Sequence, residues 1–434
     1  MKMTTKDSYN NCLNTIYHLR RYGIILGLDT IGKILQGLGN PQDTFKSIHV
    51  AGTNGKGSIA SALATILHIS GYNVGLYTSP HLVRFNERIR INNRQVSDED
   101  VVASYEAVKS VHNGSREPTF FEFATAMAFY EFGKQNVDWA VIETGMGGRL
   151  DATNIITPAL SIITNISLEH KTYLGNTIAE ITREKGGIIK NNVPVVTGVK
   201  QKNAISVLKT MADSKSAKLH RFGDAFRVRR GNGSFNYYGL ENVWRNINTG
   251  LNGAHQIDNA ALVLAACEIL NQNHLDLTLQ NIKDGLVQNR WPGRLEIVSE
   301  SPLILLDGAH NFIAARNLAA YLSETLSDRN ITLIVGILDD KPCASMLKSL
   351  VPLCSKILLT RPKIDRALPP DKLYPIAKEM ISDIQIIPDV DNAVIHAIET
   401  ASPKDAICIA GSLYVVGEAK ELFEKNPTLL SKNA

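Results

Sequence analysis

The chain contains 434 residues, of which 44% are hydrophobic and 20% are charged, and its formal net charge is +4. A chain of this length exceeds what one hydrophobic core usually supports, so we expect two or three domains. The charge is too small and too dispersed to indicate nucleic acid as the main partner.

The cysteines and the hydropathy of the chain indicate the compartment in which the protein works. The five cysteines are scattered and lack CxxC spacing, which argues against a disulfide framework and against a zinc cluster. The N-terminal residues lack an apolar segment, and no run of about 18 apolar residues occurs in the chain. We therefore expect a cytoplasmic protein that does not enter a membrane.

A glycine-rich turn at residues 52–58 follows the apolar run 47–51 and precedes a helical pattern that starts at Ile59. Glycines let backbone N–H groups close on a polyphosphate, the lysine reaches the terminal phosphates, and the serine hydroxyl holds Mg²⁺. An ordinary loop is the alternative, but the order strand, turn and helix favours a phosphate site. The sequence therefore predicts that ATP is bound by Gly52, Thr53, Asn54, Gly55, Lys56, Gly57 and Ser58.

The elements after this turn alternate between strand and helix. The helical pattern ends at Gly71, and the strand-like run 74–77 follows it. A helix is predicted at 123–132, with strands at 139–142 and 160–163. Because the strands are apolar throughout and separated by helices, they indicate a parallel sheet covered on both faces.

The texture changes between residues 219 and 253 to short alternating segments, which we interpret as a small antiparallel elaboration. The turn-rich sequence WPGR at 291–294 is interpreted as a hinge between domains. A second series of apolar strands follows it, at 303–306, 332–335, 356–359 and 406–409. The prediction is an α/β fold: a P-loop-containing doubly wound parallel sheet domain with the antiparallel elaboration at 1–293, then a smaller Rossmann-like α/β domain at 294–434.

Several polar residues follow predicted strands, where ligands gather in open α/β sheets. Glu143 ends one strand and precedes a glycine-rich segment. This position suits a carboxylate that holds Mg²⁺ beside the turn. A solvated surface acid is the alternative. His170 lies past the strand 160–163 and is a candidate metal ligand. A structural histidine is the alternative, because Mg²⁺ prefers oxygen ligands to an imidazole. Lys185 lies at a helix end, where lysine ordinarily complements the helix dipole.

Ten motifs occur in one order along nearly the whole chain: HVAGTNGKGS at 49–58, LYTSPHLVRFNERIRIN at 76–92, FFEF at 120–123, IETGMGGRLDATN at 142–154, LEHKTYLG at 168–175, EKGGIIK at 184–190, WPGRLE at 291–296, LDGAHN at 306–311, GILDDKP at 336–342 and GSLY at 411–414. Together they resemble the folylpolyglutamate synthase and dihydrofolate synthase family of the Mur ligase superfamily. Two small departures are Glu169, where aspartate is usual, and Phe312, where proline is usual.

The resemblance implies an ADP-forming amide ligase. A folate carboxylate attacks the γ-phosphate of ATP to give an acyl phosphate, and the amine of L-glutamate displaces phosphate. Such a reaction brings anions together, so it requires Mg²⁺ and lysine more than a covalent nucleophile. The resemblance also implies a carbamylated Lys185 as an anionic metal ligand and leaves room for K⁺.

The same resemblance assigns roles to individual residues. The implied metal ligands are Ser58, Ser79, Glu143, His170 and Lys185, and the implied catalytic residues are Lys56, His170, Lys185 and His310. The implied nucleotide contacts outside the turn are Asn259, Arg294 and Asp307, and those to glutamate are His310 and Ser412. The implied pterin pocket contains Leu26, Gly27, Leu28, Asp29, Phe120, Phe121, Glu122 and Asp151. For the two phenylalanines, plain core packing is the alternative.

Three hypotheses about function stay open. The segment ILGLD at 25–29 favours an enzyme that accepts dihydropteroate as well as tetrahydrofolate (poly)glutamates, and a monofunctional folylpolyglutamate synthase is the alternative. A peptidoglycan-type amino-acid ligase would share the phosphate turn, but the segments 76–92 and 120–123 favour the folate branch. A nucleotide-binding switch would not need Glu143, His170 or Lys185. We expect a monomer that binds small molecules.

Overall fold

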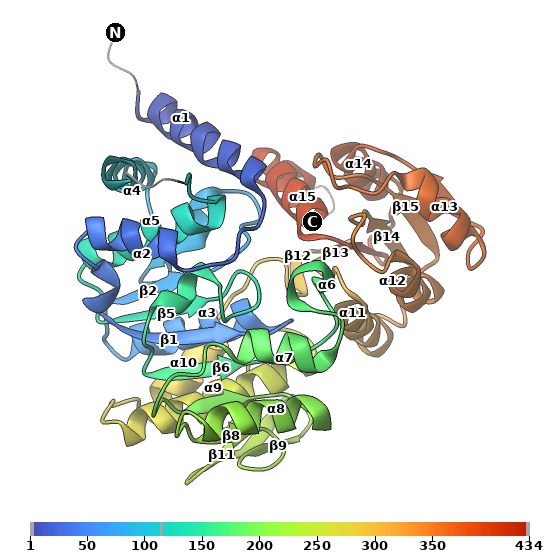
Figure 1. The fold of residues 1–434 in the computed structure, drawn as a ribbon. Helices are drawn as coiled ribbons and strands as arrows, with labels where there is room; N and C mark the ends of the chain where they lie inside the picture. The colour runs from blue at the N-terminus through green and yellow to red at the C-terminus, as the bar shows by residue number, and fades with distance from the viewer. Residues whose placement is uncertain (1–3, 113–115, 431–434) are drawn as a thin grey trace. The chain divides into compact units, whose positions relative to one another are not determined.

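The computed structural model describes residues 4–112 and 116–430 (Figure 1). The chain divides into two compact units. The first comprises Met1–Gly250 and Gln256–Arg290, and the second comprises Leu251–His255 and Trp291–Ala434. Among the described residues, no helix combines the length and the apolar character needed to cross a bilayer.

An eight-stranded sheet forms the centre of the first unit, in the order β4-β3-β2-β5-β1-β6-β7-β8. The strands are β1 (Lys46–Ala51), β2 (Val74–Tyr77), β3 (Ile89–Ile91), β4 (Arg94–Gln95), β5 (Trp139–Glu143), β6 (Leu160–Ile163), β7 (Val195–Thr197) and β8 (Leu219–Arg221). Six of them are parallel, as the sequence predicts, whereas β3 and β4 are antiparallel at one edge.

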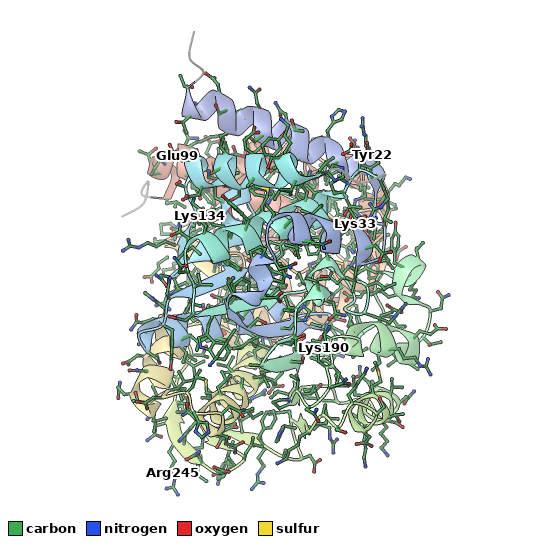
Figure 2. All side chains as sticks on the ribbon, turned by 60° about the vertical axis from the view of Figure 1, so that its left-hand side comes forward. Tyr22, Lys33, Glu99, Lys134, Lys190 and Arg245 are labelled. Carbon is green, nitrogen blue, oxygen red and sulfur yellow. The ribbon has the colours of Figure 1, made fainter. Side chains whose placement is uncertain are left out.

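Helices cover both faces of this sheet. One face carries α1 (Thr5–His18), α2 (Asp29–Gly37), α4 (Asp98–Val111) and α5 (Phe120–Lys134) over one half, and α7 (Ile178–Gly186) and α8 (Lys202–Asp213) over the other. On the opposite face α3 (Lys56–Ile69) packs against α10 (Leu279–Gln288). An ion pair of 2.9 Å between Lys134 and Asp100 joins the end of α5 to α4 (Figure 2).

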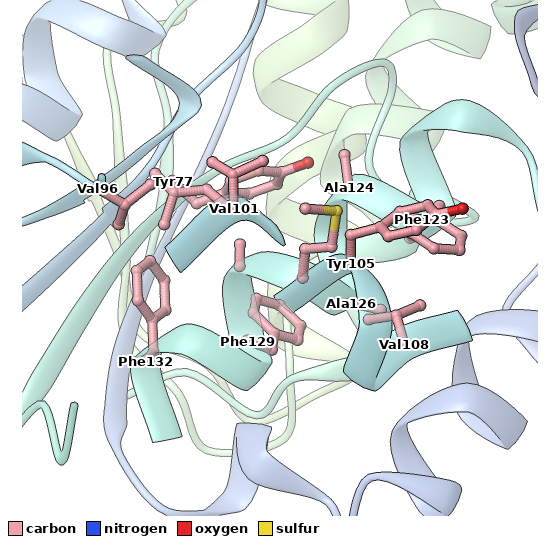
Figure 3. Packing of buried hydrophobic residues seen from close by; sticks show 14 of the residues in the cluster. Tyr77, Val96, Val101, Tyr105, Val108, Phe123, Ala124, Ala126, Phe129 and Phe132 are labelled. Atoms are coloured by element: carbon pink, nitrogen blue, oxygen red, sulfur yellow. The ribbon is translucent and has the colours of Figure 1, made fainter. Parts of the chain in front are cut away.

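The core beneath α4 and α5 is rich in aromatic side chains. Tyr77 of β2 lies fully buried with Phe129 and Phe132 of α5, and Val101 of α4 packs on the same cluster (Figure 3). A Cβ at Gly75 would lie 2.6 Å from the Phe132 ring, so only glycine lets α5 pack this closely on β2. Fully burying one such phenylalanine contributes about 2 to 3 kcal/mol. This packing anchors the second half of α5 on β2.

The antiparallel elaboration is smaller than the sequence predicts. It contains β9 (Arg227–Arg230), β10 (Phe235–Tyr238) and β11 (Val243–Ile247), in the order β11-β10-β9. The residues of β8, which we assigned to it, instead extend the main sheet, because their backbone pairs in parallel with the edge of β7. Buried Glu268 of α9 (Ala254–Gln272) holds the β10–β11 turn by accepting hydrogen bonds from Tyr237 (2.7 Å) and from backbone N–H groups, including those of Leu240 and Asn242.

The second unit is a six-stranded sheet in the order β12-β13-β17-β14-β15-β16. Its strands are β12 (Glu296–Glu300), β13 (Leu303–Leu306), β14 (Ile331–Val335), β15 (Lys356–Leu359), β16 (Ile384–Ile386) and β17 (Ala406–Ala410), and β12 alone among these strands is antiparallel. Its helices are α11 (Phe312–Thr325), α12 (Cys343–Leu350), α13 (Pro370–Lys378), α14 (Val390–Thr400) and α15 (Leu413–Lys425). The first three share one core with the sheet.

Candidate active site

The glycine-rich turn joins β1 to α3, as the sequence predicts, but α3 begins at Lys56 rather than at Ile59. The Nζ of Lys56 donates to the carbonyls of Gly52 (3.0 Å) and Thr53 (3.1 Å), so the lysine curls over the turn. Behind the turn, Thr164 Oγ1 donates to the Asn54 carbonyl (2.6 Å), and Asn165 Oδ1 accepts from the Asn54 N–H (3.0 Å). The phosphate cradle is therefore held in shape by the chain itself.

Helix α9 contacts the cradle through Asn259. Gly55 has a φ of +84°, and a Cβ there would lie 2.6 Å from Asn259 Oδ1, so glycine is required both by the backbone and by this neighbour. The Asn259 amide donates to Gln256 Oε1 (2.8 Å), and Gln256 in turn donates to Ser58 Oγ (3.5 Å). The structure thus brings Asn259 to the turn and adds Gln256, one helical turn earlier, which our sequence analysis missed.

Glu143 and Ser79 meet beside the cradle. The Ser79 N–H donates to Glu143 Oε2 (3.2 Å), and Lys56 Nζ lies 3.9 Å from Glu143 Oε1. This follows from the sheet, because β5 lies between β1 and β2 and Glu143 is paired with Val50. A carboxylate oxygen and serine hydroxyl oxygens are the ligand types that Mg²⁺ prefers. Glu143, Ser79 and Ser58 would therefore suit a magnesium ion, which would neutralise phosphate charge at the cradle.

His170, another predicted metal ligand, differs from the others in its exposure and in its backbone conformation. It is exposed and adopts a left-handed backbone conformation, with φ 47°, at the start of α6 (Lys171–Leu174). Such a conformation is uncommon for a residue other than glycine and is often found at functional sites. Among residues 4–112 and 116–430, no three His, Cys, Asp or Glu side chains gather as a metal site. Its role as a ligand stays a prediction.

Lys185 lies at the same turn, fully enclosed. Its Nζ donates to the Gly52 carbonyl (2.9 Å) and to Glu169 Oε1 (2.7 Å), and its side chain is 2% exposed. Burial would raise the pKa of Glu169, but the charges of Lys185 and Lys56 outweigh it and lower this pKa to about 2. Burial lowers the pKa of Lys185. The charge of Lys56 lowers this pKa further, whereas the charge of Glu169 acts to raise it. A lysine perturbed in this direction suits the neutral amine that carbamylation requires.

Two of the predicted pterin segments contact the loop 145–151. The Gly27 N–H donates to the Leu150 carbonyl (3.4 Å), which places the segment 26–29 against this loop. Phe121 packs on the same loop, since a Cβ at Gly145 would lie 2.5 Å from its ring. Phe120 and Phe121 are half-buried and rest on the core, with rings near Tyr17 and Tyr77, respectively. Both interpretations of the two phenylalanines therefore fit their surroundings.

The two predicted pterin carboxylates are engaged by the chain. Glu122 accepts from the Thr119 N–H (2.8 Å) as part of a capping box at the start of α5, and it pairs with Arg116 (2.7 Å). Asp151 accepts from the Met146 N–H (2.8 Å) and from Thr153 Oγ1 (2.6 Å), and its burial raises its pKa. The chain itself thus holds both carboxylates in place, and their contact with a pterin stays a prediction.

The predicted residues of the second unit cluster at the carboxyl edge of its sheet. Asp307, just after β13, accepts from the N–H groups of Leu295 and Ala309, both at 2.9 Å. Its burial, opposed by Arg294, raises its pKa to about 6. His310 Nδ1 donates to the Gly308 carbonyl (2.8 Å), which fixes its tautomer, and buried Ser412 caps α15. A Cβ at Gly308 would collide with Arg294, so Arg294 lies directly against this loop.

Comparison with known proteins agrees with this geometry. Residues 50–267 match the Mur ligase middle domain, and residues 293–413 match the Mur ligase glutamate ligase domain. The fold is that of a Mur ligase. The dihydrofolate synthase/folylpolyglutamate synthase of Bacillus subtilis is 34% identical over 428 residues, which cover 95% of this chain and 99% of that protein. The chain belongs to the dihydrofolate synthase/folylpolyglutamate synthase family of Mur ligases.

Two solved structures have the same fold over nearly the whole chain. Escherichia coli FolC in complex with DHPP and ADP has a TM-score of 0.89 and 28% identity, with 96% of this chain and 98% of that chain covered. The bifunctional folylpolyglutamate synthase/dihydrofolate synthase of Yersinia pestis, complexed with AMPPNP and a Mn ion, has a TM-score of 0.87 and 30% identity, with 98% and 100% covered. These relatives bind nucleotides, and one also binds a divalent metal.

Proposed function

We propose that this chain is an ATP-dependent ligase that adds L-glutamate both to dihydropteroate and to tetrahydrofolate (poly)glutamates through an acyl phosphate. One observation supports this most directly. Lys56 and Lys185 both donate to the carbonyl of Gly52, at 3.0 and 2.9 Å, so two amines converge on the first glycine of the phosphate cradle. The Lys56 cation suits a reaction in which negative charge develops between a carboxylate and a phosphate, and Lys185 places a second amine beside it.

The residues divide the chemistry between them. Lys56, at the start of α3, leaves the carbonyls it now contacts and binds the terminal phosphates of ATP. Ser58, Ser79, Glu143 and His170 would hold Mg²⁺, which neutralises phosphate charge when it is bound. Lys185, as the free amine or as a carbamate, acts where the acyl phosphate forms, and K⁺ remains a candidate further ion. In the second unit, Asp307 and Arg294 are assigned to the nucleotide, and His310 and Ser412 to glutamate.

The use of two acceptors is supported by the loop 145–151. Gly27, Phe121 and Asp151 meet there, on the loop that follows Glu143, and an aromatic ring beside a polar group suits a flat pterin ring. The Escherichia coli relative bound to DHPP and ADP, and the bifunctional names of the Bacillus and Yersinia relatives, favour the same interpretation. A monofunctional folylpolyglutamate synthase and another Mur-type ligase are the alternatives.

The test is ADP release by the purified protein with Mg²⁺-ATP and L-glutamate, run in parallel with dihydropteroate and with tetrahydrofolate, with products identified by mass. We expect turnover with both acceptors, and no ADP release above background when glutamate is omitted. Turnover with one acceptor would reduce the function to that single reaction. ATP binding without turnover on either acceptor would contradict the folate assignment and direct attention to other carboxylates.

We further propose a cytoplasmic monomer. All five cysteines are free, and three of them, Cys12, Cys267 and Cys408, are buried thiols whose pKa values are raised by burial. Free thiols are typical of a reducing compartment. The assembly is checked by light scattering of the purified chain at assay concentration, where a mass near 47.6 kDa is expected. A mass of twice this value would overturn the monomer.

A further inference from the structure

A second polar cluster lies near the cradle and takes no part in the chemistry assigned above. Arg88, at the end of η3 (Phe85–Arg88), donates from Nε to His81 Nδ1 (2.8 Å). A guanidinium group only donates, so His81 Nδ1 is an acceptor and its proton resides on Nε2. His81 Nε2 lies 3.4 Å from Tyr17 Oη and points its N–H at that oxygen. The Tyr17 hydroxyl proton is thereby directed to another acceptor.

Arg20, on η1 (Leu19–Tyr22), completes the cluster with an exposed positive charge. Its guanidinium carbon lies 4.2 Å from the centre of the Tyr17 ring and 5.0 Å from that of Phe120. No acidic side chain forms an ion pair with Arg20 in the parts of the chain that the structure describes. The acid whose charge acts on Tyr17 is Glu87, but its oxygens accept from the N–H groups of residues 82, 83 and 84. The cluster therefore presents donors and positive charge.

This cluster adjoins the residues assigned to the acceptor. His81 is two residues from Ser79, whose N–H contacts Glu143, so it lies on the loop that leaves the carboxyl end of β2. Phe120, whose ring lies near both Tyr17 and Arg20, precedes Phe121, which packs on Gly145. An acceptor bound at the loop 145–151 would have Tyr17 and Arg20 along one side.

We propose that Tyr17 and Arg20, positioned by the His81–Arg88 pair, bind a non-reacting carboxylate of the glutamyl tail of a folate acceptor. The inference rests on the proposed function and refines it. Dihydropteroate has one carboxylate, and that carboxylate reacts. A tetrahydrofolate (poly)glutamate also carries α-carboxylates that do not react, and a guanidinium beside a directed hydroxyl donor is complementary to such a group. The subsite would therefore serve the second reaction and not the first.

The test compares two acceptors in variants of neighbouring residues. Arg20→Ala is expected to lower the ratio of kcat/KM for tetrahydrofolate diglutamate to that for dihydropteroate about ten-fold, mainly through KM, because one charge-assisted hydrogen bond is lost. Tyr17→Phe keeps the ring and is expected to lower the ratio in the same direction by a smaller factor. The control is Arg21→Ala, since Arg21 is exposed on the same helical turn but donates to Tyr22 (2.7 Å), labelled in Figure 2. It should leave the ratio unchanged.

Several outcomes would overturn the subsite. An unchanged ratio in Arg20→Ala would remove Arg20 from the subsite. The same fall of the ratio in Arg21→Ala would leave general surface charge as the explanation. An equal loss with both acceptors, together with a lower melting temperature, would assign Arg20 a structural role. A wild-type protein that uses dihydropteroate alone would reject the subsite while leaving the ligase activity in place. Turnover with neither acceptor would reject the proposed function itself, and the subsite with it.

Discussion

The Nζ of Lys185 lies 2.7 Å from Oε1 of Glu169, and both groups are buried beside the carbonyl of Gly52. A buried ion pair contributes little net stability compared with apolar residues, but removal of one partner leaves the other charge uncompensated. The pair thus holds Lys185 as an ordered amine at the phosphate cradle. A carbamate on Lys185 would be an anion beside Glu169, so its formation requires Glu169 to turn away or to gain a cation.

This arrangement predicts separate effects on stability and on activity. Lys185→Ala should abolish turnover and lower the free energy of unfolding by about 3 kcal/mol, because Glu169 is left buried and charged. Adding Glu169→Gln to that variant should recover part of the stability and none of the activity. Denaturant unfolding and ADP release measure the two properties.

Short carboxylates such as acetate test the chemical form of Lys185. If the active form is a carbamate, they should restore part of the turnover of Lys185→Ala, because they replace its anionic oxygen. Full activity of the variant without any addition would remove Lys185 from the mechanism.

Asp307 predicts a specific dependence of stability on pH. Its pKa is raised to about 6 in the folded chain, so between its unfolded value of about 4 and 6 the folded state holds the proton that the unfolded state has lost. Stability then falls as pH rises through this window. Between pH 5 and pH 8, the wild type should lose about 1.4 kcal/mol more than Asp307→Asn. Chemical denaturation of both proteins across this range checks it, and parallel curves would contradict it.

Gly55 predicts a loss of nucleotide affinity beyond simple backbone strain. Gly55→Ala forces an alanine into φ +84° and drives its Cβ against Asn259. Gly39 has nearly the same φ, +82°, with open space around it, so Gly39→Ala incurs only the strain of about 1 to 2 kcal/mol. We expect ATP binding, measured by calorimetry, to weaken about ten-fold or more in Gly55→Ala and to be unchanged in Gly39→Ala. Equal ATP affinities of the two variants would show that the contact between Gly55 and Asn259 does not affect nucleotide binding.

Glu143 predicts a metal-specific defect. Glu143→Gln keeps the size of the side chain but removes the charge, so the apparent Mg²⁺ affinity in the ADP-release assay should fall by about 100-fold. Nucleotide binding without metal should persist, since Lys56 and the turn are intact. Glu241→Gln, an exposed acid at the β10–β11 turn, serves as the control. A Mg²⁺ titration identical to that of the wild type would show that Glu143 is not a ligand.

The central strands and the phosphate turn could be predicted from the sequence because their apolar runs and glycines depend on local physics alone. The strands near the edges of the two sheets could not be predicted in this way. Strands β3, β4 and β16 are only two or three residues long, which is too short to show a pattern, so their pairing depends on the neighbouring strand. The contact of Gln256 with Ser58 joins residues 198 positions apart. By contrast, the capping role of Glu122 was readable, since Thr119 and Glu122 have capping-box spacing.

The reversal of direction between β2 and β3 decides where the residues that follow β2 lie. Because β3 runs antiparallel to β2, and the Thr78 N–H donates to the Arg88 carbonyl (3.0 Å), the segment 78–88 leaves and re-enters the sheet at the same edge. A parallel connection would have crossed to the other end and tied the segment to the core. The hairpin instead keeps Ser79, His81 and Arg88 together at the carboxyl end of β2, where Ser79 contacts Glu143.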